Sequence, residues 1–220
     1  MIPLRDVIPS RTTPYLTVSI IVLNAIAWLF ELALPREDLP LFLQQFGVVP
    51  AYFSAPTLIS SMFLHGSWSH VLGNMWYLWI FGDNVEDRLG HGRFLVFYLL
   101  CGIAAAIGQI AIDPNSTLPT IGASGAIAGV MGAYFVLYPH SRVLTLIPLI
   151  IFWEIIELPA ILLLGFWFLM QLFNAGAIAV TASSHGSGGV AFMAHVAGFV
   201  FGVIGVFVFR RGRQPENRWV

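Results

Sequence analysis

The sequence contains no lysine and only one cysteine, and Asp, Glu, Lys and Arg together make up 10% of its 220 residues. A single cysteine, Cys101, excludes an intramolecular disulfide and speaks against a cysteine-ligated metal site. With a formal net charge of −1, nothing in the chain indicates a nucleic-acid partner. The charged fraction is also far below the roughly 25% of an ordinary soluble domain.

Long apolar runs take the place of the missing charges. Hydrophobic residues make up 58% of the chain, and several runs approach the roughly 20 residues that a helix needs to cross a bilayer. Since backbone polar groups must be satisfied inside the hydrocarbon, the predicted fold class is an all-α polytopic membrane protein. The predicted spans are 15–34, 70–87, 94–112, 124–138, 158–175 and 190–209. The stretch 143–157 is expected to be a buried or interfacial lead-in to the fifth of these spans.

The ten basic residues, all of them arginine, indicate the orientation of these spans. With six spans only Arg36 lies on the outer side, and the positive-inside rule then places both termini in the cytoplasm. The chain is thus divided into an N-terminal arm (1–14), a six-span domain (15–210) and a cytoplasmic tail (211–220). The arginines predicted on the cytoplasmic side are Arg5, Arg11, Arg88, Arg93, Arg142, Arg210, Arg211, Arg213 and Arg218.

Polar residues stand near the outer ends of the second, fourth and sixth spans. His70 and Asn74 are four residues apart and so share one helix face. His195 follows the start of the sixth span at a depth of about 7.5 Å. The fourth span, beginning at Ser124, covers only about 22 Å of a core about 30 Å thick, which puts Ser124 roughly 8 Å below the outer surface. These residues are expected to meet in a submerged aqueous pocket.

Small residues follow two of these polar groups. One stripe runs from Ser124 through Ala128 to Gly132, and a second follows His195 along the sixth span. Such stripes let helix backbones approach closely, so the fourth and sixth spans are expected to pack together and bring the hydroxyl and the imidazole within reach of each other. Gly122, before the serine, is expected to let the backbone turn from the loop into the fourth span. The other glycines given a structural role in this packing are Gly125, Gly129, Gly132, Gly198 and Gly202.

A hydroxyl beside an imidazole is the arrangement of a nucleophile and its base. No acidic residue lies in the outer half of the second, fourth or sixth span, which predicts a Ser/His dyad without a third member. Asn74, His70 and the Ser124 backbone N–H are suitable donors for an oxyanion. No H-E-x-x-H motif and no pair of membrane-embedded aspartates occurs, so no metal or organic cofactor is predicted. Glu154 and Glu157 are expected to be interfacial and structural.

These segments resemble the rhomboid intramembrane serine proteases. "GASG" with Ser124, "AHVAG" with His195 and "HVLGN" with His70 and Asn74 are similar to that family's three active-site elements, in the same order, and the likeness covers about residues 15–210. The resemblance implies a six-helix bundle with a short fourth span, in which Ser124 is the nucleophile and His195 the general base. It implies an oxyanion hole made by His70, Asn74 and the Ser124 amide.

The resemblance also implies that the substrates are transmembrane segments of membrane proteins, cleaved near the outer leaflet of a bacterial inner membrane without a cofactor. Some members carry a tyrosine that stacks on the catalytic imidazole four residues after the serine, where this chain has Ala128. The loop 183–189 is expected to cap the cavity.

Two alternative functions stay open: a non-catalytic rhomboid-like protein that binds transmembrane helices in quality control, and a haem protein ligated by His70 and His195. The sequence indicates no oligomeric state.

Overall fold

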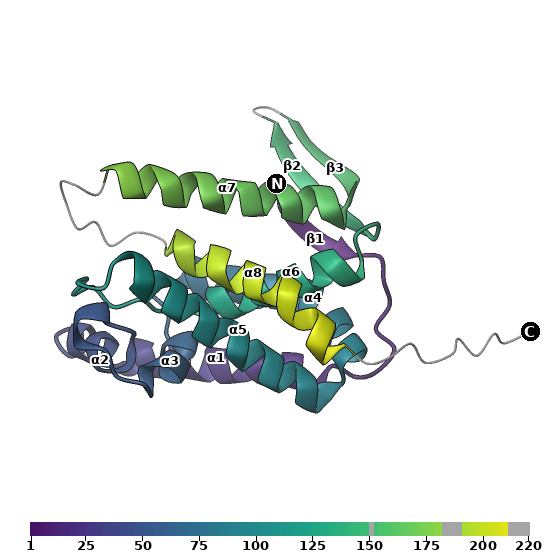
Figure 1. Ribbon diagram of the computed structural model, residues 1–220. Helices are drawn as coiled ribbons and strands as arrows, with labels where there is room; N and C mark the ends of the chain where they lie inside the picture. Colours follow the sequence, from purple (N-terminus) through teal and green to yellow (C-terminus); the bar gives the residue numbers. More distant parts are fainter. Residues whose placement is uncertain (150–151, 182–190, 211–220) are drawn as a thin grey trace, which may run out of the picture.

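Six long helices make up most of the protein, a computed structural model of which describes residues 1–149, 152–181 and 191–210 (Figure 1). Each helix coincides with one predicted span, and the largest difference is at α7, which ends six residues beyond the predicted 158–175. The long helices are α1 (Tyr15–Ala33), α4 (Trp68–Leu89), α5 (His91–Ile112), α6 (Ser124–Leu137), α7 (Ala160–Thr181) and α8 (Phe192–Phe209). The connection from α1 to α4 contains α2 (Leu39–Phe46), η1 (Pro50–Tyr52), α3 (Thr57–Ser60) and η2 (Ser61–Phe63).

Four of these helices, α1, α5, α7 and α8, are long and apolar enough to cross a membrane. Helix α6 is apolar but has only 14 residues. Helix α4 has 22 residues, and its last two turns carry Asp83, Glu86, Asp87 and Arg88. The protein is therefore a mostly helical integral membrane protein, and its α6 is short as the sequence predicts.

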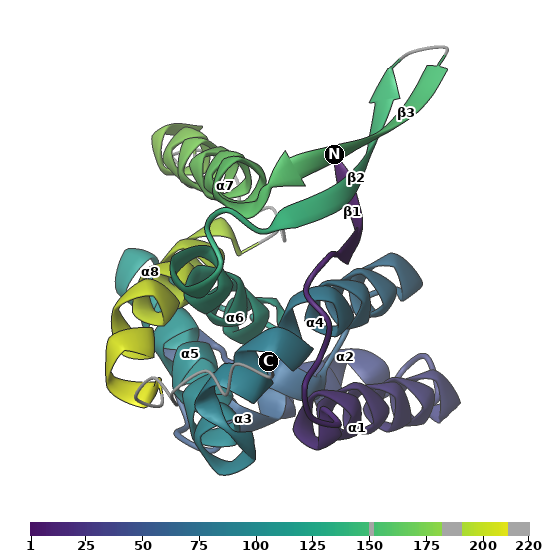
Figure 2. The ribbon, with the colours of Figure 1, turned by 90° about the vertical axis from the view of Figure 1, so that its right-hand side faces the viewer.

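The fold is mostly helical as predicted but not all-α, because the described residues also include a three-stranded antiparallel sheet in the order β1-β2-β3. Strand β1 (Ile2–Asp6) comes from the N-terminal arm, while β2 (Arg142–Leu149) and β3 (Phe152–Pro159) form a hairpin in place of the expected lead-in. Isoleucine, valine, threonine and aromatic residues are frequent in this hairpin, which favours strands. Figure 2 shows the hairpin projecting from the helices beside α7.

Helix α6 lies in the middle of the bundle, in contact with α4, α5, α7 and α8 (Figure 2). Every residue from Gly125 to Tyr134 is buried. Small side chains on α6 leave room for its neighbours to approach closely. The first residue of this central helix is Ser124, so the site is built at the end of the most enclosed element.

Helices α6 and α8 pack closely as predicted. On α6, however, the contact is made by Gly125 and Gly129, which lie one position after Ser124 and Ala128 of the predicted stripe. A Cβ on Gly202 would overlap the carbonyl of Gly129, and one on Gly198 would overlap that of Gly125. Two turns of a helix take about 7.2 residues, so Gly125, Gly129 and Gly132 stay on one face better than the predicted stripe, which spans eight residues. The contact therefore leaves the Ser124 side chain at the edge of the interface.

Candidate functional site

Ser124 and His195 are brought together as the sequence predicts. The hydroxyl of Ser124, in the first turn of α6, lies 2.8 Å from Nε2 of His195, in the first turn of α8. This is an ordinary hydrogen-bond distance for an O–H donor. The two residues are 71 positions apart in the chain, and the glycine contacts between α6 and α8 account for their proximity.

The other nitrogen of His195 has a partner that the sequence did not reveal. Nδ1 lies 2.8 Å from Oε1 of Gln171, on α7. An amide oxygen only accepts, so Nδ1 carries the proton and Nε2 presents its lone pair to the Ser124 hydroxyl. The sequence predicts a dyad from the second, fourth and sixth spans, whereas this partner is a neutral amide on the fifth. The signal present in the sequence is an amide within an apolar span, which Gln171 shares with Asn174.

Aromatic side chains surround the His195 ring where the sequence offers only Ala128. The indole of Trp167, on α7, lies with its ring centre 5.9 Å from that of His195, and the ring planes are inclined by 35°. Phe192 approaches edge-on at 6.4 Å. Ala128 itself is fully buried. Contacts to the imidazole therefore come from α7 and from the start of α8 rather than from the position after the serine.

The turn that leads into Ser124 lies against the two residues predicted as oxyanion donors. Gly122 has a φ of +122°, a conformation that side chains disfavour. A Cβ on Gly122 would lie 2.6 Å from Nε2 of His70 and 3.7 Å from Nδ2 of Asn74. Gly122 therefore lets the chain turn into α6 as predicted, and its lack of a side chain also allows His70 and Asn74 to approach the backbone beside Ser124.

Asn74 is held by a neighbour from the preceding loop. Its Nδ2 lies 3.0 Å from Nε2 of His65, a side chain that is only 1% exposed. Burial, and then the nearby His70 imidazole, lower the pKa of His65 to about 4, so His65 is neutral near pH 7 and accepts the Asn74 N–H. The backbone N–H of His65 in turn donates to the Glu31 carboxylate. One amide hydrogen of Asn74 is thus engaged, and among the residues that the structure describes the second has no acceptor.

Neither a metal centre nor a haem site is indicated by this geometry. Within residues 1–149, 152–181 and 191–210 there is no group of three or more His, Cys, Asp or Glu side chains placed to hold a metal ion. Both ring nitrogens of His195 are occupied by hydrogen bonds, which speaks against its use as a haem ligand.

Glu157, one of the two glutamates expected to be structural, accepts a hydrogen bond from Arg142 across the hairpin at 3.1 Å and is exposed. This contact is consistent with a structural role.

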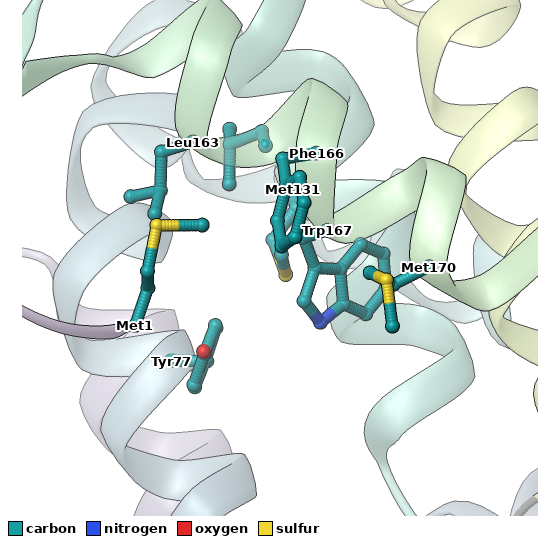
Figure 3. Close-up of a pocket in the computed structure, with 8 residues that line it drawn as sticks. Met1, Tyr77, Met131, Leu163, Phe166, Trp167 and Met170 are labelled. Carbon is teal, nitrogen blue, oxygen red and sulfur yellow. The ribbon is translucent and has the colours of Figure 1, made fainter. Parts of the chain in front are cut away.

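A cavity of about 100 Å³ lies beside Trp167 of α7 (Figure 3). Its lining comes mainly from α7 and is completed by Met131 of α6, Tyr77 of α4 and Met1, and most of it is apolar. Trp167 lines this cavity and also contacts His195. Ser124 is not among its lining residues, so this cavity is a different space from the aqueous pocket expected at Ser124. The loop 183–189, expected to cap the site, lies outside the described residues.

Comparison with known proteins places this architecture in a family. The chain is 41% identical over 76 residues to the rhomboid protease GluP of Bacillus subtilis, covering 34% of this chain and 14% of that protein. It is 32% identical over 109 residues to the mitochondrial Rhomboid protein 1 of Saccharomyces cerevisiae, covering 47% and 32%. It is 26% identical over 167 residues to the chloroplastic Rhomboid-like protein 11 of Arabidopsis thaliana, covering 74% and 54%.

The chain therefore spans less than two thirds of the length of each of these relatives. The family model of the Rhomboid domain matches residues 53–212, well over half of this chain. That range contains the Ser124–His195 pair, the His70 and Asn74 side chains and the α7 residues beside them. The chain belongs to the rhomboid family.

Proposed function

We propose that this protein is an intramembrane serine endopeptidase in which Ser124 is the nucleophile and His195 the general base. The observation that carries the proposal is the 2.8 Å approach of the Ser124 hydroxyl to Nε2 of His195, the ring nitrogen that can accept its proton because Nδ1 donates to Gln171. Membership of the rhomboid family supports protease activity at the level of the family. The pair has the nucleophile-and-base relationship that acyl transfer requires.

The reaction is a hydrolysis in two stages. As the Ser124 oxygen adds to the scissile carbonyl carbon, His195 takes its proton, and the peptide C–N bond then breaks while His195 returns that proton to the leaving amine. Water next attacks the acyl ester while His195 takes a proton from it, and the bond to Ser124 then breaks as His195 gives that proton to the Ser124 oxygen, which releases a carboxylic acid and restores the pair. His70, Asn74 and the Ser124 backbone N–H donate to the oxyanion in both stages. No cofactor takes part.

The substrates proposed are transmembrane segments of other membrane proteins that enter laterally from the bilayer beside α7. The outward face of α7 supports this, because Leu169 and Phe173 are 62% and 73% exposed and so fit a hydrocarbon environment. A helical peptide bond is shielded by its own turn, so residues of low helix propensity near the cleavage site would make local unwinding less costly.

The proposed topology has six spans in a bacterial inner membrane, with the domain at 15–210 and with the arm 1–14 and the tail 211–220 in the cytoplasm. Nine of the ten arginines lie on the side assigned to the cytoplasm, which supports this orientation. Alkaline phosphatase fused after Val220 is expected to stay inactive, since it folds only outside the cytoplasm. An active fusion would overturn the even number of spans.

A fluorophosphonate probe tests the proposed activity directly. The detergent-solubilised protein is expected to be labelled, and mass spectrometry is expected to find the adduct on Ser124, because an activated serine oxygen attacks the probe's phosphorus. A non-catalytic helix-binding relative would not be labelled. Equal labelling of the wild-type protein and the Ser124→Ala variant would contradict the proposal.

A further inference from the structure

We propose that Gln171 is a positioning residue for the reaction: it accepts the Nδ1 proton of His195 and so fixes the tautomer in which Nε2 can take the Ser124 proton. The inference rests on the proposed function, since it gives His195 the role of base. It extends the Ser/His pair to a Ser/His/Gln triad, with the third member supplied by α7. Trp167, four residues before Gln171, helps by restricting the tilt of the imidazole ring.

The geometry of Gln171 fits this role. Its Oε1 lies 2.8 Å from Nδ1, the same distance as separates Nε2 from the Ser124 hydroxyl, so one imidazole bridges the two side chains. Gln171 is only 8% exposed, which keeps water from replacing it as the acceptor. Residues four apart share a helix face, so Trp167 and Gln171 reach the same ring from the same side of α7.

A neutral imidazole can carry its proton on either nitrogen, and only one form is a competent base here. With the proton on Nε2, the ring would face the Ser124 hydroxyl with a donor and could not accept from it. In serine proteases of the Ser-His-Asp type, loss of the correct tautomer lowers kcat by about 10⁴-fold. An acceptor at Nδ1 therefore favours the competent tautomer, and Gln171 occupies that position.

The choice of an amide over a carboxylate has a physical reason. An ionised carboxylate within a membrane-spanning helix is costly, because low polarity penalises an isolated charge. An amide oxygen supplies the same acceptor without a charge. It attracts the imidazolium formed during catalysis less strongly than a carboxylate does, so the principal effect of Gln171 is on the tautomer and orientation of the neutral ring.

The first experiment compares Gln171→Met, Gln171→Glu and the control Gln109→Met. Methionine keeps the size of the side chain but has no comparable acceptor, while a glutamate carboxyl group, ionised or protonated, keeps an oxygen for Nδ1. Gln109 is the matched control because it is a partly buried glutamine in another long helix, α5. Cleavage of a fluorescent transmembrane substrate is measured in proteoliposomes, together with the yield and thermal stability of each variant.

Gln171→Met is expected to lower kcat roughly 10- to 100-fold, less than the loss of an ionised triad carboxylate, with KM within about twofold of the wild-type value. Gln171→Glu is expected to recover most of the lost rate, and Gln109→Met to behave like the wild-type protein. An unchanged kcat in Gln171→Met overturns the inference. So does a Gln171→Glu variant that is as slow as Gln171→Met although both are folded.

A second measurement does not depend on activity. In protein labelled with ¹⁵N-histidine, the two His195 nitrogens are expected to give the chemical shifts of the Nδ1-protonated tautomer, and Gln171→Met is expected to show the other tautomer or a mixture. Unchanged His195 shifts in that variant would overturn the inference. If the wild-type protein neither cleaves nor reacts with the fluorophosphonate, the proposed function fails, while these spectra still decide whether Gln171 sets the tautomer.

Discussion

Cleavage of a transmembrane substrate is expected to fall by at least about 10⁴-fold when either Ser124 or His195 is replaced by alanine, and to fall no further when both are replaced. The hydroxyl and the imidazole act in one step, because the 2.8 Å hydrogen bond between them carries the proton that leaves the nucleophile. Removing either partner removes that step. The measurement is the single-turnover rate in proteoliposomes, with the three variants reconstituted at equal density.

Two control variants separate this effect from a general loss of structure. Ser19 lies on α1 and bonds back to the carbonyl of Tyr15, and His140 is exposed in the connection after α6. Ser19→Ala and His140→Ala are expected to keep wild-type rates. If Ser124→Ala retained more than a tenth of the activity while remaining folded, another nucleophile would have to be sought. If the losses of the two single variants instead multiplied in the double variant, Ser124 and His195 would not act as a pair.

The pairing of Ser124 with His195 could be predicted because the helices, their orientation and their close contacts each leave a pattern in the sequence. The long apolar runs determined the helices, and the arginine distribution indicated which helix ends lie at the same level. The glycines then indicated which two helices approach most closely. The error of one position in the α6 stripe arose because spacings of four were followed along a helix whose period is 3.6. Gly125 and Gly129, rather than Ser124 and Ala128, therefore form the contact with α8.

The parts that could not be predicted depend on contacts between distant segments. Strand β1 pairs with β2, for example Ile2 with Leu146, and nothing within the N-terminal arm indicates that partner. The role of Gln171 depends on the rotation of α7 about its own axis, which packing against α8 determines. An amide also carries no charge, so the distribution of acidic residues does not point to it. The contact between Gln171 and His195 can be recognised only from the three-dimensional arrangement of the helices.

Replacing Asn74 by alanine is expected to lower kcat by about 10²- to 10³-fold, with little change in KM. Asn74 lies beside the Gly122 turn that leads into Ser124, and one of its amide hydrogens is held by His65. The remaining hydrogen is proposed to bond the oxygen that becomes negative as Ser124 attacks, an interaction that is stronger in the transition state than in the bound substrate. Initial rates over a range of substrate concentrations separate kcat from KM.

A peptide aldehyde, which forms a tetrahedral adduct with a serine, distinguishes this role from a structural one. If Asn74 stabilises the oxyanion, its alanine variant binds the aldehyde more weakly by the factor lost in kcat/KM, while binding of a matched peptide alcohol is unchanged. Asn24→Ala removes another buried asparagine, whose amide bonds to the Ile20 carbonyl in α1, and is expected to affect neither inhibitor. Equal weakening of aldehyde and alcohol binding by Asn74→Ala would assign Asn74 to substrate binding or folding, because only a group that acts on the developing charge can discriminate between these two inhibitors.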